Sequence, residues 1–394
     1  MKLSWPTWLW EKYTPVFAVY MLAIILVTLQ SYLLPLQSYG TEGFLYTHYN
    51  NYIIFKQSFF HLIQHKNLYH WYEPEQWDLF KYSPSFALLF GVFAYLPDPV
   101  GLLIWNILNV GCLIVALVQV PRLPDRARVI MLFFILVEVV ISIQSTQSNA
   151  LIAGLLVLAF IAMERNRPML AAVLITSTVF IKLFGLFGFG LFLFYPCRWK
   201  GAMAAAMSMI LFAFLPLIVL SWSELMMQYQ GWYDTLAEDR VETGLSVLGW
   251  FQSWFGLNAN PNTVVLIGFL MLLVPLLRWR CWIYYPFRLM ALASVLIWVV
   301  IFNHMAESPT FVIAVTGAGI WFFARSRPGY QQFWLWFILL FTSLSTTDLF
   351  PKDFQLSVVE PFVLKAVPCI ALWVWITIEM LIYRPERKTE PTTA

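Results

Sequence analysis

The chain has 394 residues, of which 60% are hydrophobic and only 11% are charged. A soluble domain carries roughly 25% charged residues, so this composition excludes a soluble fold and indicates an integral membrane protein. The net charge of +3 is small and the basic residues fall in short loops, which predicts membrane lipids rather than nucleic acid as partners.

Twelve apolar runs follow one another along the chain, and most approach the ~20 residues that a membrane-spanning helix needs. The runs cover about 15–35, 84–97, 99–120, 128–143, 147–163, 168–196, 201–221, 262–277, 282–302, 309–324, 332–346 and 361–383. The first run follows Lys2 and Lys12 and lacks a small-residue cleavage site, so we interpret it as an uncleaved signal anchor. The sequence predicts an all-α polytopic membrane protein with about 10–13 transmembrane helices, formed by one integral membrane domain that covers residues 1–394.

Two of these runs have unusual lengths. The run 84–97 is too short to span and ends in Pro97-Asp98-Pro99, whereas 168–196 is too long for one helix and contains Lys182 and three glycines. We expect the first to be a re-entrant or short helix and the second to be a hairpin with Lys182 at its tip.

Basic residues predict the orientation, because Lys and Arg are retained on the cytoplasmic side. The clusters are Arg122/Arg126/Arg128, Arg165/Arg167, Arg198/Lys200, Arg278/Arg280, Arg325/Arg327 and Arg384/Arg387/Lys388. An even number of crossings between successive clusters requires the two unusual runs to behave as proposed. We therefore expect a multi-pass protein of the cell (inner or plasma) membrane, with the N-terminus and the short tail 384–394 cytoplasmic.

The noncytoplasmic face then receives the long loops 36–83, 222–261 and 347–360, and we expect the active face there. These loops contain the acidic residues Glu42, Glu73, Glu75, Asp78, Glu224, Asp234, Glu238, Asp239, Glu242, Asp348, Asp353 and Glu360. In the first outer loop, residues 51–64 predict an interfacial helix on the membrane surface. Its apolar side would carry Ile54, Phe55, Phe59, Leu62 and Ile63.

Lys182 is a candidate ligand-binding residue, since a cation in an apolar run is costly without a partner or water. About 18 residues at ~1.5 Å each separate it from Glu164, which places it roughly 27 Å up, near the outer interface. A lipid phosphate is the natural partner at that depth. The alternative is a snorkelling lysine that only marks the end of a helix.

Two short polar turns on the outer side are further candidates. Residues 144–149, Gln-Ser-Thr-Gln-Ser-Asn, suit sugar hydroxyls, which need donors and acceptors without fixed charge. A tight turn with an N-cap is the alternative. The turn 303–309 contains His304 and Glu307, which suit acid–base chemistry or phosphate binding, although capping by Ser308 ahead of Pro309 explains the pattern equally well.

Cofactor chemistry has little support in the sequence. His48, His61, His65 and His70 match no zinc spacing, so no metal site is predicted and a divalent ion is not expected. Dinucleotide and Walker motifs are absent, so we expect no cofactor.

Glu138, inside the run 128–143, is a functional candidate because an intramembrane carboxylate is costly. The alternative is that it is protonated or hydrogen-bonded to a neighbouring helix.

Several segments, in order, resemble the glycosyltransferase 87 family, polytopic mannosyltransferase-like proteins of the GT-C superfamily. Lys81-Tyr82-Ser83-Pro84 and the following apolar residues resemble the family's Tyr-x-Pro segment and short dipping helix, and 105–109 resembles the next helix. Gln147-Ser148-Asn149 is similar to a Gly-Gln-x-Asn motif with Thr146 in place of Gly, and 180–184 resembles a Lys-containing hairpin. Gly244-Leu245-Ser246 and Asn303-His304 are looser matches, and the resemblance spans about 45–325.

This resemblance implies a GT-C-like fold and an inverting hexosyltransferase. The hexose, with mannose as the first candidate, would pass from a polyprenyl-phosphate donor to a lipid or glycan acceptor on the outer face. It places donor phosphate and sugar contacts at Lys182, Gln147 and Asn149, and we expect further contacts with the donor at Tyr82, His304 and Glu307. The family's first-loop Asp, the expected base, falls on Asn51.

An amide is no useful proton acceptor, so three readings stay open. Another first-loop group acts as the base, with Glu42, Glu73, Glu75, Asp78 and His48 as the candidates, while Asn51 positions the acceptor. Alternatively, the chain is an inactive scaffold of a glycan-assembly system. A third hypothesis is a lipid or solute transporter or flippase that uses Lys182 and Glu138, although we find no internal repeat of the kind transporters show.

Overall fold

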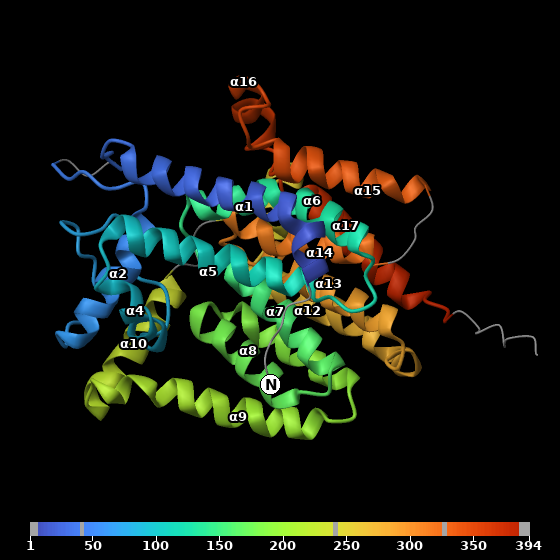
Figure 1. Ribbon diagram of the computed structural model, residues 1–394, viewed down its shortest axis with the longest axis horizontal. Coiled ribbons are helices and arrows are strands. Elements are labelled where there is room, and N and C mark those ends of the chain that lie inside the picture. The colour runs from blue at the N-terminus through green and yellow to red at the C-terminus, as the bar shows by residue number, and fades with distance from the viewer. Residues whose placement is uncertain (1–6, 40–42, 239–242, 325–328, 386–394) are drawn as a thin grey trace, which may run out of the picture.

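The protein is described by a computed structural model that covers residues 7–39, 43–238, 243–324 and 329–385. Nearly all regular structure in these ranges is helical, and the single extended pairing is an isolated bridge between Gln37 and Tyr46. The long helices α1 (Thr7–Leu33), α5 (Asp98–Val118) and α9 (Arg198–Phe214) run along the long axis of the molecule (Figure 1). The predicted all-α polytopic fold is confirmed.

The remaining elements follow in chain order. The α-helices are α2 (Asn50–Ile63), α3 (Pro84–Leu89), α4 (Gly91–Ala94), α6 (Asp125–Gln144), α7 (Asn149–Glu164), α8 (Pro168–Ile181), α10 (Trp222–Glu238), α11 (Val247–Phe255), α12 (Pro261–Leu273), α13 (Tyr285–Ile301), α14 (Phe311–Phe323), α15 (Gln332–Phe337), α16 (Lys352–Phe354) and α17 (Val367–Leu381). The 3₁₀ and π segments are η1 (Leu183–Phe194), η2 (Leu215–Ile218), η3 (Val274–Leu277), η4 (Trp279–Cys281), η5 (Ser308–Thr310), η6 (Gly329–Gln331), η7 (Ile338–Leu344) and η8 (Gln355–Val359).

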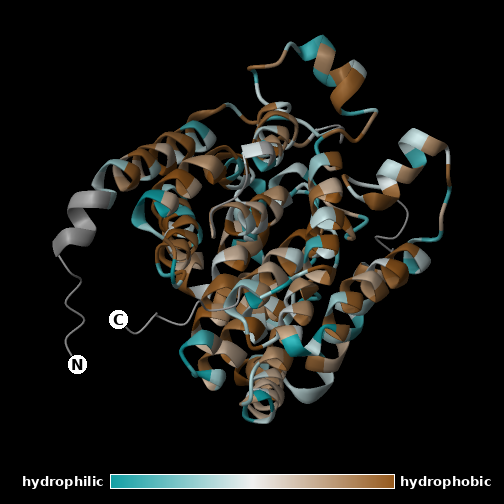
Figure 2. Cartoon of the chain, turned by 90° about the vertical axis from the view of Figure 1, so that its right-hand side faces the viewer, coloured by the Kyte–Doolittle hydropathy of each residue, from teal (hydrophilic) through white to brown (hydrophobic). Residues whose placement is uncertain are grey.

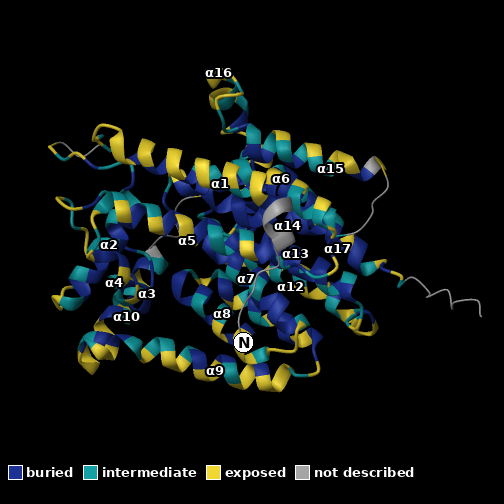
Figure 3. Cartoon of the chain, in the orientation of Figure 1, coloured by how far each residue is buried: buried dark blue, intermediate teal, exposed yellow. Residues whose placement is uncertain are grey.

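Four helices in the described ranges are long and apolar enough to cross a membrane. They are Tyr13–Leu33, Asp98–Val118, Asp125–Gln144 and Arg198–Ile218, and eight shorter apolar helices accompany them. Hydrophobic residues predominate along the helices (Figure 2). The outward sides of α1 and α9 expose apolar residues such as Leu22 and Met207, whereas α13 and α14 at the centre are buried along most of their length (Figure 3). Such an apolar exterior suits lipid.

The predicted hairpin is present. α8 ends at Ile181, Lys182 takes an extended conformation, and η1 returns beside α8. A Cβ on Gly185 would lie 2.6 Å from the backbone nitrogen of Val179, and one on Gly188 would lie 3.3 Å from Ile175. The pairs 178/185 and 175/188 lie opposite each other, so the two arms are antiparallel and Lys182 occupies the tip. These close approaches explain why the returning arm contains glycine.

The short run and the first-loop helix are both observed, with one difference from prediction. Residues 84–94 form the two short helices α3 and α4, which are too short to span. Helix α2 is present, but its apolar side does not lie against lipid. Phe55 is fully buried and contacts the rings of Tyr82, Phe86 and Trp105, because α3, α4 and α5 cover this side of the helix.

The segment 222–261, predicted as the second outer loop, is not irregular, because it contains α10 and α11. Gln228 of α10 binds the first loop through two hydrogen bonds. Its amide oxygen accepts from the backbone nitrogen of Leu68 at 3.0 Å, and its amide nitrogen donates to the carbonyl of Lys66 at 2.8 Å. The segment 347–360, predicted as the third outer loop, contains α16, which projects from the body of the molecule (Figure 1). Several predicted residues lie outside the described ranges: Lys2, Glu42, Asp239, Glu242, Arg325, Arg327, Arg387 and Lys388.

Candidate functional site

The tip of the hairpin brings Lys182 to the polar turn before α7. Lys182 Nζ donates to Asn149 Oδ1 at 3.1 Å and to Gln147 Oε1 at 3.4 Å. It also lies 5.8 Å from the centroid of the Tyr82 ring and 5.7 Å from that of Phe184. All these partners are electrically neutral, so the ammonium charge is solvated by amide oxygens and π faces without being cancelled.

Gln147 links this cation to a carboxylate. Its Nε2 donates to Glu307 Oε2 at 2.6 Å, while its Oε1 also accepts from Asn149 Nδ2 at 2.7 Å. An ammonium can only donate and a carboxylate can only accept, so the chemistry of the neighbours fixes which end of the Gln147 amide faces each of them. Glu307 and Lys182 therefore stand on opposite sides of a single side-chain amide.

The turn that carries these amides is anchored by two helices. Thr146 has φ +51°, in the left-handed region that favours glycine, which explains why glycine suits this position in the resembling motif. Here the strain is offset by hydrogen bonds: the Tyr52 backbone nitrogen donates to Thr146 Oγ1 at 3.2 Å, and Trp105 Nε1 donates to the Thr146 carbonyl at 3.0 Å. Helices α2 and α5 thus position Gln147 and Asn149.

Glu307 is held through its own backbone. The backbone nitrogen of Leu245 donates to the Ala306 carbonyl at 2.8 Å, and the nitrogen of Gly244 donates to the His304 carbonyl. A Cβ on Gly244 would lie 2.6 Å from the Ala306 oxygen, so this approach requires glycine. The segment before α11 therefore fixes the turn before η5, while the Glu307 side chain is exposed.

Tyr82 and His304 differ in the hydrogen bonds that they make within the protein. Burial raises the pKa of the Tyr82 hydroxyl, so this group stays protonated and can act as a donor. The Tyr82 backbone carbonyl accepts from Tyr69 at 2.8 Å, which fixes the loop before α3. The Nε2 atom of His304 is buried and makes no hydrogen bond within the described part of the chain. The structure gives His304 no contact with Lys182.

Asn51 has a structural partner. Its Nδ2 donates to the Ser145 carbonyl at 2.8 Å, which ties α2 to the turn that carries Gln147. A carboxylate cannot donate to a carbonyl, so an amide is the group this contact needs. Asn51 is therefore close to the site but is committed to holding it together.

The other first-loop candidates are not brought to the cation. Glu75 pairs with His61 at 2.9 Å, and Asp78 pairs with Lys81 at 3.6 Å. Glu73 is half-buried, and its backbone carbonyl accepts from Tyr46 at 2.9 Å. His48 is also half-buried. Within the described ranges no group of three or more His, Cys, Asp or Glu side chains could hold a metal ion.

Sequence reasoning missed the partner of Glu138. Lys365 Nζ lies 2.9 Å from Glu138 Oε1, and the two side chains are 1% and 0% exposed. Lys365 also donates to Thr346 Oγ1 at 3.4 Å and lies 5.5 Å from the Phe311 ring centroid. The sequence signal for this pair is a lysine within the apolar run 361–383, which is the same kind of signal that marks Lys182. The Glu138 carboxylate is therefore paired with a cation and closed off from solvent.

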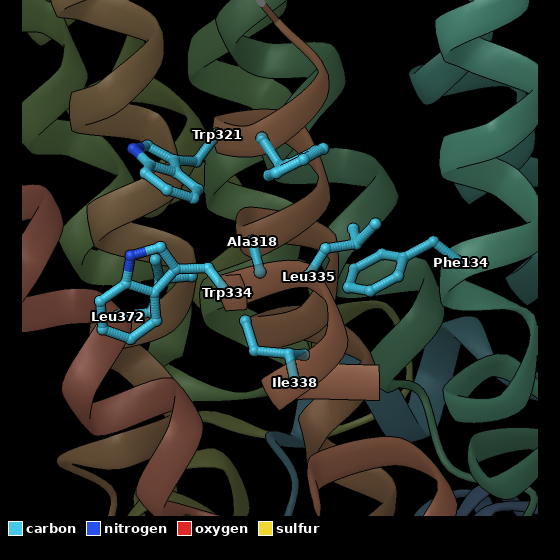
Figure 4. A pocket seen from close by; sticks show the side chains of 8 residues that line it. Phe134, Ala318, Trp321, Trp334, Leu335, Ile338 and Leu372 are labelled. Atoms are coloured by element: carbon cyan, nitrogen blue, oxygen red, sulfur yellow. The ribbon is translucent and has the colours of Figure 1, made fainter. Parts of the chain in front are cut away.

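A shallow apolar hollow lies elsewhere, between α6, α14, α15, η7 and α17. It is lined by Phe134, Ala318, Trp321, Phe322, Trp334, Leu335, Ile338 and Leu372 (Figure 4). Its lining carries no charged side chain. It is therefore separate in chemistry from the Lys182 site.

Comparison with known proteins identifies the family. The structure is similar to that of ArnT from Cupriavidus metallidurans bound to undecaprenyl phosphate, with 12% sequence identity, a TM-score of 0.41 and coverage of 94% of this chain and 76% of that chain. No curated protein matches the sequence. The model of glycosyltransferase family 87 matches residues 80–344, a segment that contains Tyr82, Gln147, Lys182 and Glu307 and begins after Asn51. Since this match covers more than half of the sequence, the chain belongs to glycosyltransferase family 87.

Proposed function

We propose that the protein transfers a hexose, with mannose as the first candidate, from a polyprenyl-phosphate donor to a lipid or glycan acceptor, with inversion at the anomeric carbon. The reaction takes place on the noncytoplasmic face, with both termini in the cytoplasm. Family membership supports glycosyl transfer. The observation that carries the proposed donor is the Lys182 ammonium at the tip of an apolar hairpin, held by neutral groups alone.

The chemistry of the donor matches this arrangement. A polyprenyl phosphate joins an apolar chain, which lies in lipid, to an anion at the headgroup layer. An ammonium without a carboxylate partner can form a charge-assisted hydrogen bond with that anion. As the bond between the sugar and phosphate breaks, negative charge grows on the phosphate oxygen, and the same ammonium stabilises it. The protonated Tyr82 hydroxyl is a second donor beside Lys182.

The amides of the turn suit the sugar. Gln147 and Asn149 hold Lys182 in place through their oxygen atoms. Side-chain amides also offer the uncharged donors and acceptors that hydroxyl groups need. We propose that both residues bind the donor near its anomeric carbon and that no resident cofactor takes part.

The transport alternative is less well supported by the geometry. It requires Lys182 and Glu138 along one pathway. Glu138 is instead paired with Lys365, and the side chains of that pair are almost completely buried. The scaffold alternative was motivated by Asn51, and the contact of that residue with Ser145 accounts for an amide there without implying inactivity. A transfer assay separates these alternatives.

The test uses the purified full-length chain in proteoliposomes with radiolabelled undecaprenyl-phosphate mannose and lipid extracted from the source cells as the acceptor mixture. We expect transfer to fall about 10–100-fold in Lys182→Ala, the range for losing a hydrogen bond to a charged group. Lys352→Ala, which removes an exposed lysine from α16, is the matched control and should keep full transfer. Equal transfer in the two variants would contradict the proposal, and no transfer by the unmodified chain with any polyprenyl-phosphate sugar would favour the scaffold.

A further inference from the structure

We propose that Glu307 is the general base of this reaction and takes the proton of the acceptor hydroxyl. The inference rests on the proposed function and deepens it by assigning the general base, a role that the amide of Asn51 cannot fill. The geometry that carries it is the hydrogen-bonded row of Glu307, Gln147 and Lys182.

The position of Glu307 is that of a group facing the donor's sugar. With the donor phosphate at Lys182, one side-chain amide separates the phosphate site from the Glu307 carboxylate. In an inverting displacement, the attacking hydroxyl approaches the anomeric carbon from the side opposite the phosphate. A base must therefore stand across the sugar from the cation, and Glu307 stands across Gln147 from Lys182.

Its carboxylate is also accessible and incompletely used. The residue is exposed, so an acceptor can approach it from outside the protein. Gln147 engages Oε2, whereas Oε1 has no hydrogen-bond partner within the described part of the chain. A free oxygen on a positioned carboxylate is what a general base requires.

The backbone around Glu307 restricts its movement. Ala306 is 1% exposed and its carbonyl is fixed by Leu245, while the Glu307 carbonyl accepts from the backbone nitrogen of Thr310 at 3.0 Å. The backbone of Glu307 is therefore fixed, and only its side-chain torsions can change the position of the carboxylate. Its contact with Gln147 holds the carboxylate toward the cation.

The competing carboxylates are poorer candidates. Glu75 is paired with His61 and Asp78 with Lys81. Asp98 lies 2.6 Å from Lys56, so it too is neutralised. Among the first-loop candidates that the structure describes, a set that does not include Glu42, Glu73 is the rival that the test must address, because its carboxylate makes no hydrogen bond to another described residue.

The step balances without a further reactant. The acceptor O–H bond breaks and its proton passes to Glu307 Oε1. The acceptor oxygen forms a bond to the anomeric carbon, and the bond from that carbon to the phosphate oxygen breaks. The polyprenyl phosphate leaves with the electron pair, beside Lys182. Glu307 then releases its proton to water.

The test compares isosteric variants in the same transfer assay. Glu307→Gln keeps the shape of the side chain but removes the base, and we expect transfer to fall at least about 100-fold, within the range for general base catalysis. Glu360→Gln, at an exposed carboxylate in the third outer loop, is the matched control and should retain transfer. Glu73→Gln should retain at least half of it.

Two further measurements separate a base from a structural group. Undecaprenyl phosphate binding, followed by native mass spectrometry, should be preserved in Glu307→Gln, which also shows that the variant is folded. Formate at high concentration should restore part of the transfer to Glu307→Ala and none to Lys182→Ala, because a small carboxylate can replace a missing base but not a missing cation.

The outcomes are distinguishable. Full transfer by Glu307→Gln would overturn the inference and leave the proposed function intact, and loss of transfer in Glu73→Gln alone would assign the base to Glu73. Loss in Glu307→Gln together with loss of undecaprenyl phosphate binding and no formate rescue would also overturn it, since the residue would then be structural. No transfer by the unmodified chain would overturn both proposals.

Discussion

Two lysines lie inside apolar segments of this protein, and their surroundings are opposite. Lys365 meets the carboxylate of Glu138 at 2.9 Å in a site that is almost completely closed. Lys182 meets two amide oxygens at 3.1 and 3.4 Å and is only partly buried. The first charge is cancelled by the protein, whereas the second is held in place but left uncancelled. An anionic ligand therefore has a reason to bind at one lysine and none at the other.

The difference follows from what each site must do. A buried pair tolerates two charges only because each is the counter-ion of the other, and it ties α6 to the segment before α17. The neutral partners of Lys182 lower the desolvation cost of placing a cation there without neutralising it. The ammonium can therefore still bind a phosphate. Three substitutions test this contrast, in order of decreasing effect.

Lys365→Met should cause the largest loss of stability. It leaves Glu138 without its counter-ion in a closed apolar site, and breaking such a pair costs about 3–5 kcal/mol. Thermal unfolding in detergent, followed by intrinsic tryptophan fluorescence, measures the loss. The double variant Lys365→Met with Glu138→Leu should recover most of it, because two apolar side chains can fill the site. A single variant as stable as the unmodified chain would show that the pair is not structural.

Lys182→Met makes the same chemical change at the other lysine and should give the opposite result. We expect only a small loss of stability, because the change removes the donor to the Gln147 and Asn149 oxygens but leaves no carboxylate without a direct partner. Undecaprenyl phosphate binding should fall about 10–100-fold. Native mass spectrometry and the same unfolding assay give the two values side by side. A large drop in unfolding temperature without a change in binding would mean that Lys182, too, is a structural residue.

Asn149→Asp should convert the first kind of site into the second, with a smaller effect. The new carboxylate replaces the amide oxygen that accepts from Lys182, so it neutralises the cation and repels phosphate. Binding of undecaprenyl phosphate should weaken about tenfold, or ~1.4 kcal/mol. Asn258→Asp, at an exposed position before α12, is the control for an added charge. Unchanged binding would show that the phosphate does not depend on an uncancelled ammonium.

Much of the fold could be predicted because hydropathy and charge are local signals. The basic loops required an even number of crossings, and this condition led to the hairpin with Lys182 at its tip. The contacts of Gly185 and Gly188 with α8 bear that prediction out. The helix 51–64 was also found, but not its environment, since periodicity indicates an apolar side without identifying what covers it.

The pairings within the site could not be predicted in the same way. Glu138 and Lys365 are 227 residues apart, and Gln147 and Glu307 are 160 apart. Nothing in either segment names its partner. The resemblance places the base in the first outer loop and so makes the groups of that loop the candidates, yet the chain brings Glu307, from a turn much later in the sequence, to the row of polar groups that contains Lys182.

Gln147 also acts as a spacer. If this amide were absent, the ammonium of Lys182 and the carboxylate of Glu307 would attract each other with nothing between them, and a direct contact would satisfy both. Lys182 and Glu307 would then form an ion pair like that of Lys365 and Glu138, and neither group would be available to a substrate. Because the uncharged side chain of Gln147 bonds to both groups, they do not form a direct ion pair. The ammonium stays available to an anion, and the carboxylate stays available to a proton.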